Sequence, residues 1–199
     1  MKKALLAVGF LALLGLGIVL AQPSTVLALN MVQTTKFEVR GNDLFMQGEI
    51  NSKTLEQFEE IIAEHPQIER LIETNVPGSL DDETMIALAY RVRELGLDTM
   101  LLADSEIHSG GVDLFLAGVE RNAERGAVIG VHSWSDGVNE ATDYPRGAVE
   151  HETNRAYIEA MLGDDAFYWF TIEAAPAAGI HVMSEEEILK YGLLTGPWQ

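Results

Sequence analysis

The chain has 199 residues, with 13 basic and 31 acidic side chains and a formal net charge of −18 at pH 7. So acidic a surface repels phosphate backbones and anionic lipid headgroups, and we therefore expect no nucleic-acid partner. The chain has no cysteine, which excludes disulfides, a thiol nucleophile and a cysteine-ligated metal.

The start of the chain has the pattern of a secretory signal peptide. Lys2 and Lys3 precede an apolar stretch over residues 4–21, and Val19-Leu20-Ala21 carries small residues where a signal peptidase cuts. A second candidate cut follows Val26-Leu27-Ala28. The alternative is an uncleaved anchor, because about 18 apolar residues can just span a bilayer. In either case we predict an exported protein, periplasmic or extracellular, that contacts a membrane only through this segment.

Loss of the predicted signal peptide, residues 1–21, would leave 11 basic against 31 acidic residues, a formal charge of −20. Residues 22–34 are interpreted as a short polar leader. Residues 35–199 are enough for one domain whose core needs no disulfide.

The first half of this domain alternates strands and helices. Residues 36–40 and 43–50 predict a hairpin turned by Gly41-Asn42, because apolar and charged residues alternate. An amphipathic helix is expected over 54–65, before Pro66, and a strand over 68–75. After the turn Pro77-Gly78, a second helix is expected to begin near Asp81 and to run to about Leu95, where Gly96 stops it.

The second half continues the alternation. The expected elements are a strand over 99–103, a helix over 110–119, a strand over 127–132, a polar loop over 137–147, and helices over 150–161, 166–173 and 184–191. The last helix has a capping box, because Ser184 is followed three residues later by Glu187. Strand-helix-strand order predicts an α/β fold with parallel strands and crossover helices.

Two residues carry the candidate chemistry. Ser109 stands directly before a predicted helix, and His132 closes a predicted strand. A serine hydroxyl is a weak nucleophile until an adjacent base removes its proton, so this pairing is what acyl transfer requires. The pair His151-Glu152 lacks the second histidine of a zinc-protease motif and is interpreted as helix surface. No metal or organic cofactor is implied.

The order of these parts resembles the ClpP/crotonase superfamily, and more closely the exported ClpP-like proteins of bacteria. The resemblance covers about residues 48–194. It rests on Asn75-Val76-Pro77-Gly78-Ser79 and the helix after it, on His108-Ser109-Gly110 through Ala117-Gly118, on Val128-Ile129-Gly130-Val131-His132, and on Met183-Ser184 through Tyr191-Gly192-Leu193.

The resemblance implies a single-domain ClpP/crotonase-like α/β fold and an exported serine hydrolase, in the first place a peptidase that acts on peptide or protein substrates. It makes Ser109 the nucleophile and His132 the general base. The backbone N–H groups of Ser79 and Gly110 would form the oxyanion hole. Because the superfamily commonly forms rings or trimers, a homo-oligomer is implied without a fixed stoichiometry.

The sequence departs from the family at the orienting acid and at the turn. Residues 178–183 contain no aspartate, and His181 is the polar side chain nearest the expected place. Asp113 lies one helical turn after Ser109 and would face the same way, with a helix-start or rim acid as the alternative reading. Ser79 stands where the family has a second glycine.

Two main hypotheses therefore remain. The first is a serine hydrolase, and the second is a non-catalytic ClpP-like binding or scaffold protein that has lost the triad acid. A crotonase-type acyl-CoA enzyme is a distant third, because export and a charge of −20 disfavour a large anionic cofactor.

Overall fold

The computed structural model describes residues 34–199. The predictions for residues 1–33, which are the signal peptide or anchor and nearly all of the leader, lie outside the described residues. The strands are β1 (Lys36–Arg40), β2 (Asp43–Gln47), β3 (Arg70–Val76), β4 (Asp98–His108), β5 (Arg121–Ala123), β6 (Val128–Val131) and β7 (His181–Val182). The helices are α2 (Thr54–Glu64), α3 (Asp82–Glu94), α4 (Gly110–Phe115), α5 (Glu152–Leu162), α6 (Ala166–Ala174) and α7 (Glu185–Lys190), with short 3-10 helices η1 (Ala141–Asp143) and η2 (Val149–His151).

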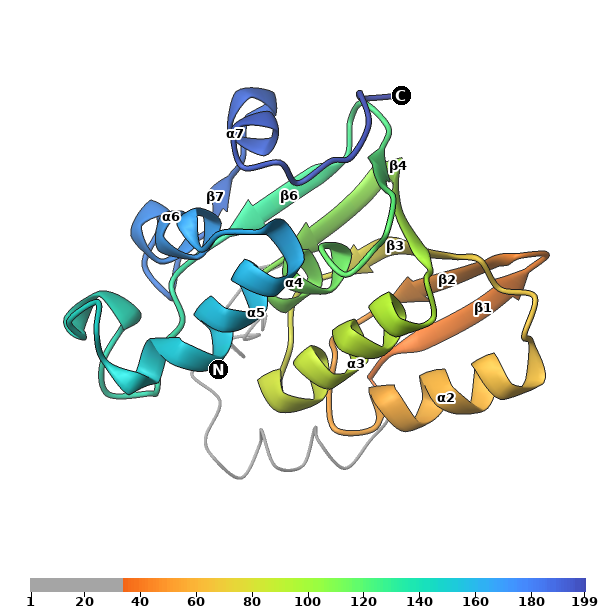
Figure 1. Ribbon diagram of the computed structural model, residues 1–199, viewed down its shortest axis with the longest axis horizontal. Helices are drawn as coiled ribbons and strands as arrows, with labels where there is room; N and C mark the ends of the chain where they lie inside the picture. The colour runs from red at the N-terminus through yellow and green to blue at the C-terminus, as the bar shows by residue number, and fades with distance from the viewer. Residues whose placement is uncertain (1–33) are drawn as a thin grey trace, which may run out of the picture.

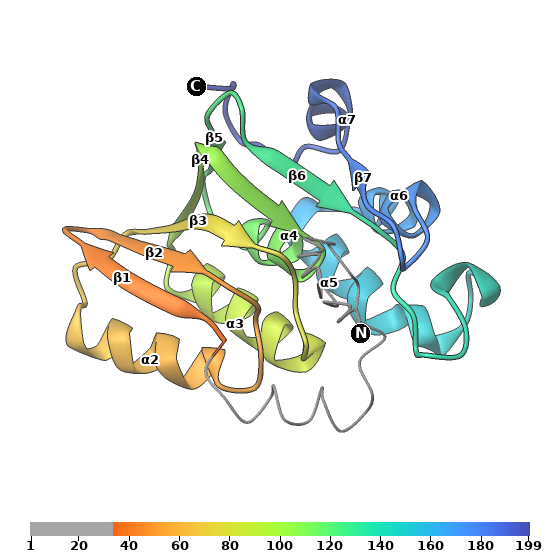
Figure 2. The ribbon, with the colours of Figure 1, turned by 180° about the vertical axis from the view of Figure 1, so that it is seen from behind.

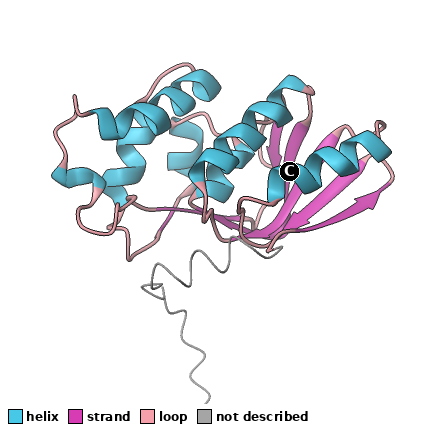
Figure 3. Ribbon diagram, turned by 90° about the horizontal axis from the view of Figure 1, so that it is seen from below, coloured by secondary structure: helices cyan, strands magenta, loops and turns pink. Residues whose placement is uncertain are grey.

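The strands form one seven-stranded sheet in the order β1-β2-β3-β4-β6-β7, with β5 paired beside β4 (Figure 1). The inner pairs are parallel, whereas β1 and β7 pair antiparallel at the two ends of the sheet. Figure 2 shows the strands from behind, and Figure 3 shows helices lying as a layer on the sheet. The predicted parallel α/β arrangement is confirmed.

Local sequence signals place several element ends where they were expected. The hairpin turns at Gly41, whose φ of 65° suits a residue without a side chain. The Asp81 carboxylate accepts a hydrogen bond from the Thr84 N–H at 3.1 Å and so caps α3. At α7, Ser184 and Glu187 form the predicted capping box.

Strand β4 is longer than the predicted strand 99–103 and ends at the residue before Ser109. An irregularity divides it, so that its first part pairs with β5 and its last part with β6. Ser105 bridges this irregularity, because its hydroxyl donates to the Glu73 carbonyl at 2.6 Å and accepts from the Leu102 N–H at 2.9 Å. These side-chain bonds satisfy backbone groups at the irregularity, and β4 can therefore continue to the residue before the candidate nucleophile Ser109.

Helix α4 is shorter than the predicted helix 110–119. The Thr99 hydroxyl donates to the Phe115 carbonyl at 2.7 Å, and the Arg93 guanidinium donates to the carbonyls of Leu116 and Ala117. These bonds take carbonyls that a longer helix would have used internally, which explains its early end. The residues of α4 other than Asp113 are packed into the core, and Leu114 and Phe115 have no exposed surface.

Arg121 fastens the C-terminal segment to the sheet. It is 8% exposed, and its guanidinium donates to the carbonyls of Leu193, Gly192 and Gly118 at 2.7, 3.1 and 3.3 Å. Backbone bonds from Thr195 to Arg121 and from Gln199 to Ala123, both 3.0 Å, continue the attachment along β5. Within residues 34–199, no helix has the length and apolar character needed to cross a membrane.

Candidate active site

Ser109 occupies the sharp turn between β4 and α4. Its φ of 51° makes it the one non-glycine residue with positive φ in the described part of the chain. The Ser109 N–H donates to the Gly130 carbonyl of β6 at 3.1 Å, which holds this conformation in place. The side chain does not cap α4, although serine usually caps at such a position. Backbone strain of this kind costs about 1–3 kcal/mol and concentrates at functional sites.

This strain has a measurable consequence. We expect the free energy of unfolding of Ser109→Gly to be about 1 kcal/mol higher than that of Ser109→Ala. Glycine relieves the strain of the positive φ, whereas alanine does not, and the gain is reduced by the greater entropy of glycine in the unfolded chain. Urea unfolding of the two variants side by side measures the difference. Equal stabilities would show that the turn is not strained.

His132 follows β6 and presents a defined ring nitrogen. Its Nδ1 lies 2.7 Å from the Ser133 carbonyl oxygen. Because a carbonyl can only accept, Nδ1 carries the proton, and Nε2 is left as the basic nitrogen. A backbone carbonyl thus takes the orienting place that an aspartate holds in a complete triad. A carbonyl fixes the tautomer that a general base needs but supplies no full negative charge.

The structure brings Ser109 and His132 to one cavity of about 60 Å³. Residues from α3, α4, β6 and its following segment, α5 and α6 line it: Asp82, Ser109, Gly110, Val112, Asp113, Val131, His132, Trp134, Asn154, Tyr157, Ile158, Tyr168, Thr171 and Ile172. No hydrogen bond joins the Ser109 hydroxyl to His132. The contributions of α5 and α6 were not predicted, because neither helix carries a recognisable motif.

The predicted oxyanion residues lie against each other beside Ser109. A Cβ added to Gly110 would lie 3.1 Å from Ser79 N and 2.8 Å from Ser79 Cβ, so only glycine fits there. Ser79 itself does not have a positive φ, whereas the preceding Gly78 has a φ of 145°. The serine in place of a second glycine is therefore unstrained, and its hydroxyl donates to the Asp82 carboxylate. No backbone carbonyl in residues 34–199 accepts from the N–H of Ser79 or Gly110.

Asp113 lines the cavity, as its one-turn spacing from Ser109 predicts. Burial raises the pKa of its carboxyl to about 7, and the neighbouring Asp82 carboxylate contributes in the same direction. It has no ion-pair partner within the described residues. His181, in contrast, is paired with α7, since its Nε2 lies 3.0 Å from the Glu187 carboxylate.

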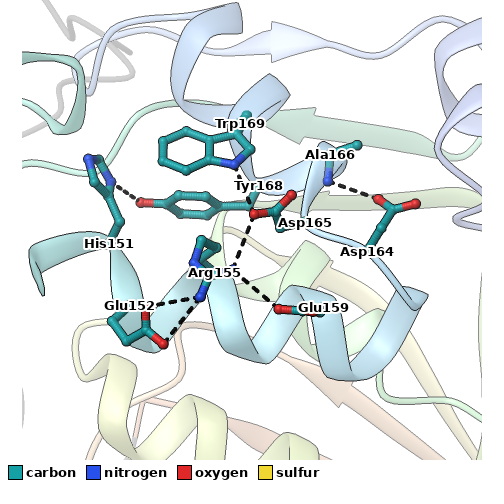
Figure 4. Close-up of polar contacts among 9 residues, drawn as sticks. All are labelled: His151, Glu152, Arg155, Glu159, Asp164, Asp165, Ala166, Tyr168 and Trp169. Carbon is teal, nitrogen blue, oxygen red and sulfur yellow. Dashed lines mark hydrogen bonds and ion pairs between the residues drawn. The ribbon is translucent and has the colours of Figure 1, made fainter. Parts of the chain in front are cut away.

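His151 is not on the surface, as the sequence had suggested, but 1% exposed in an aromatic cluster. Trp134 Nε1 donates to the Tyr168 hydroxyl at 2.9 Å. That hydroxyl lies 2.6 Å from His151 Nδ1 (Figure 4). His151 Nε2 lies 3.4 Å from the Tyr144 carbonyl oxygen, which can only accept, so Nδ1 of the neutral ring accepts and the Tyr168 hydroxyl donates to it. Trp134 stands two residues after His132, so this chain of bonds fixes the segment that carries the candidate base.

Ion pairs on the outer side of the same region join α5 to α6. Arg155 contacts Glu152 and Glu159 of its own helix and Asp165 before α6, at 3.0, 3.2 and 3.3 Å (Figure 4). Asp165 also accepts from Trp169 Nε1 at 3.1 Å. Two walls of the cavity are thus held together from outside. No cluster of three or more His, Asp or Glu side chains within residues 34–199 is placed to hold a metal ion.

No family model and no curated protein matches this sequence. Solved structures do match its fold. A serine-to-alanine variant of a membrane-bound stomatin-specific protease has a TM-score of 0.54 at 18% identity, over 76% of this chain and 75% of that chain. A lysine-to-alanine variant of the same protease, in complex with a substrate peptide, has a TM-score of 0.54 at 19% identity, over 76% and 71%. Enoyl-CoA hydratase from Thermoplasma volcanium GSS1 has a TM-score of 0.51 at 14% identity, over 83% and 71%.

Proposed function

From the premise that this chain has the ClpP/crotonase fold, as the resemblance predicts, we propose that it is an exported ClpP-like serine hydrolase. Its reaction is peptide hydrolysis by acyl transfer to Ser109, with His132 as the general base. The observation that carries the proposal is the strained turn at Ser109, whose side chain lines the same cavity as His132.

The proposed mechanism assigns one task to each group. His132 Nε2 takes the proton of the Ser109 hydroxyl as the oxygen attacks the peptide carbonyl. The N–H groups of Ser79 and Gly110 bind the oxyanion, and one such donor is worth about 10²–10³-fold in rate. His132 then protonates the leaving amine, and water attacks the acyl-enzyme in the reverse sequence. The bond between a nucleophile and its base often shortens only when substrate binds, so the lack of a hydrogen bond between the Ser109 hydroxyl and His132 is compatible with these roles.

The test is covalent labelling of the serine. We expect a fluorophosphonate probe to label the full chain and the Ser135→Ala variant equally and to leave Ser109→Ala unlabelled. Ser135 is an exposed serine three residues after His132, and it controls for the loss of a hydroxyl near the site. Equal labelling of the wild type and Ser109→Ala would contradict the proposal.

A non-catalytic ClpP-like binding or scaffold protein is the second candidate. It is favoured by the lack of an acid behind His132, where the Ser133 carbonyl stands instead. For such a protein, Ser109→Ala would leave the physiological function unimpaired and no wild-type serine would react with the probe.

Export and self-association are also proposals. The Lys2-Lys3 pair and the apolar residues 4–21 support export. N-terminal sequencing of the mature protein distinguishes a cleaved signal from an anchor, because a chain that still begins at Met1 would exclude cleavage. A homo-oligomer rests on the family resemblance, and a monomeric mass by light scattering would contradict it.

A further inference from the structure

The cavity beside Ser109 is lined by acidic groups without a basic residue to balance them. Two carboxyl groups line it, Asp82 from α3 and Asp113 from α4, and none of its lining residues is a lysine or arginine. The Ser79 hydroxyl donates to Asp82. No comparable bond to the Asp113 carboxyl is found in the described residues, and the one hydroxyl that reaches this residue, from Tyr157, donates to its backbone carbonyl at 2.6 Å.

An ionised carboxylate in this position lacks a counter-charge. Burial penalises the charged form of Asp113 and raises its pKa to about 7, with Asp82 adding repulsion. A cation that entered the cavity would remove both penalties, because it would pair with Asp113 and screen it from Asp82. The missing partner of Asp113 is therefore best supplied by a ligand.

The size and walls of the cavity restrict the shape of that ligand. Its volume is about 60 Å³, whereas an engineered cavity of about 150 Å³ is known to hold benzene. A benzene ring and a whole lysine side chain have similar volumes, so neither is enclosed completely and only the end of a side chain enters the cavity. Val112, Ile158 and Ile172 supply apolar walls for methylene groups. A lysine side chain combines such a stem with a compact ammonium, whereas the planar guanidinium of arginine is broader.

We propose that this cavity is the specificity pocket of the enzyme and binds a lysine side chain of a peptide, with Asp113 as the residue that pairs with its ammonium. The cleavage part of this inference rests on the proposed hydrolase function, but the binding of an alkylammonium does not. A chain with a net charge of −18 would also attract cationic peptides over a distance.

Binding is tested first, without any need for turnover. The probes are n-butylammonium and n-butanol, which have the same stem and differ in charge, titrated calorimetrically into the full chain at pH 8. We expect the amine to bind more tightly than the alcohol. The Asp113→Asn substitution should lower the affinity for the amine by about 10–100-fold, the usual contribution of a charge-assisted hydrogen bond. Asp104→Asn, at an exposed position outside the cavity, should have no effect.

Two results would overturn the inference. One is equal affinity of the wild type for the amine and the alcohol. The other is an amine affinity that Asp113→Asn does not change. Because Asn is close in size to Asp, an intact far-ultraviolet circular dichroism spectrum separates lost charge from lost fold.

Cleavage is tested with peptides that carry lysine or norleucine before the scissile bond. We expect kcat/KM to favour lysine in the wild type and to show no preference in Asp113→Asn. The lysine preference should rise with pH through about 7, as Asp113 ionises. The other titratable groups that face the cavity are Asp82 from α3, His132 after β6, Tyr157 of α5 and Tyr168 of α6. A pH profile that Asp113→Asn leaves unchanged would assign the titration to one of these groups and contradict the role of Asp113.

The two proposals fail in different ways. A fluorophosphonate that labels Ser109, together with no discrimination between amine and alcohol, would leave the hydrolase standing and remove the lysine pocket. An amine that binds through Asp113 to a protein without a reactive Ser109 would keep the pocket and remove the hydrolase.

Discussion

His132→Ala should lower kcat of the proposed hydrolase by about 10²–10⁴-fold, the usual contribution of a general base. The reason is that His132 lines the same cavity as Ser109, and its Nδ1 is held by the Ser133 carbonyl, which leaves Nε2 as the basic nitrogen. Single-turnover hydrolysis of an activated ester measures the chemical step directly. His65→Ala, at the C-terminal end of α2, is the matched control and should retain wild-type turnover.

The same measurement can show that the two residues act as one unit. If His132 works only by activating Ser109, the double variant with Ser109→Ala should be no slower than Ser109→Ala alone. Multiplicative losses would mean that His132 serves turnover by some other route, for example by contacting substrate. A His132→Ala variant at wild-type speed would contradict the proposed mechanism outright.

Glu73→Met should stabilise the protein by about 1–3 kcal/mol at pH 7, the typical cost of leaving a buried polar group unsatisfied. Glu73 lies in the middle of β3 with no exposed surface, and within residues 34–199 neither of its carboxylate oxygens has a hydrogen-bond partner. Met has a similar length and brings no polar atom, so it should fill the same space. The midpoint of guanidinium unfolding measures the gain.

The pH dependence of this gain follows from the direction of the shift. Burial raises the pKa of Glu73 well above its ordinary value, so the folded state holds the proton more tightly than the unfolded state. Stability is then lost as pH rises above the unfolded pKa near 4.5 and continues to fall up to the folded pKa. Glu73→Gln, which cannot ionise, should therefore be more stable than the wild type at pH 7 and should lose that advantage near pH 4.

An exposed acid provides the control for Glu73. Glu60→Gln, on the outer side of α2, should shift the midpoint little at either pH. Destabilisation by both Glu73→Met and Glu73→Gln would contradict the view that this buried carboxyl lowers the stability of the fold.

Sequence patterns predicted those parts of the fold that depend on near neighbours in the chain. The turn at Gly41, the start of α3 at Asp81 and the capping box of Ser184 are each set by two to four consecutive residues, and all three are present. Strands β5 and β7 were missed because three and two residues are too few to show a period. The end of α4 was missed because Thr99 and Arg93, which satisfy its carbonyls, come from distant parts of the chain.

The candidate site was predictable to the same extent. The turn at Ser109 and the strand end at His132 are local features, whereas their meeting at one cavity was implied by the family resemblance. The orienting group of His132 could not be predicted, because it is the backbone carbonyl of Ser133 and has no side-chain signature. His151 was assigned to the surface because Trp134 and Tyr168, which enclose it, lie 17 residues away on either side of it in the sequence.

The attachment of the C-terminal segment to β5 also bears on how copies of this protein can meet. A short strand at the border of a sheet offers unpaired N–H and C=O groups, to which a second polypeptide can add and begin aggregation. Here the backbone N–H groups of Thr195 and Gln199 donate to the carbonyls of Arg121 and Ala123. The backbone N–H of Arg125 donates in turn to the Gln199 carbonyl. Strand addition is thereby blocked at β5. A homo-oligomer of this chain has to assemble through side-chain surfaces or through another border of the sheet.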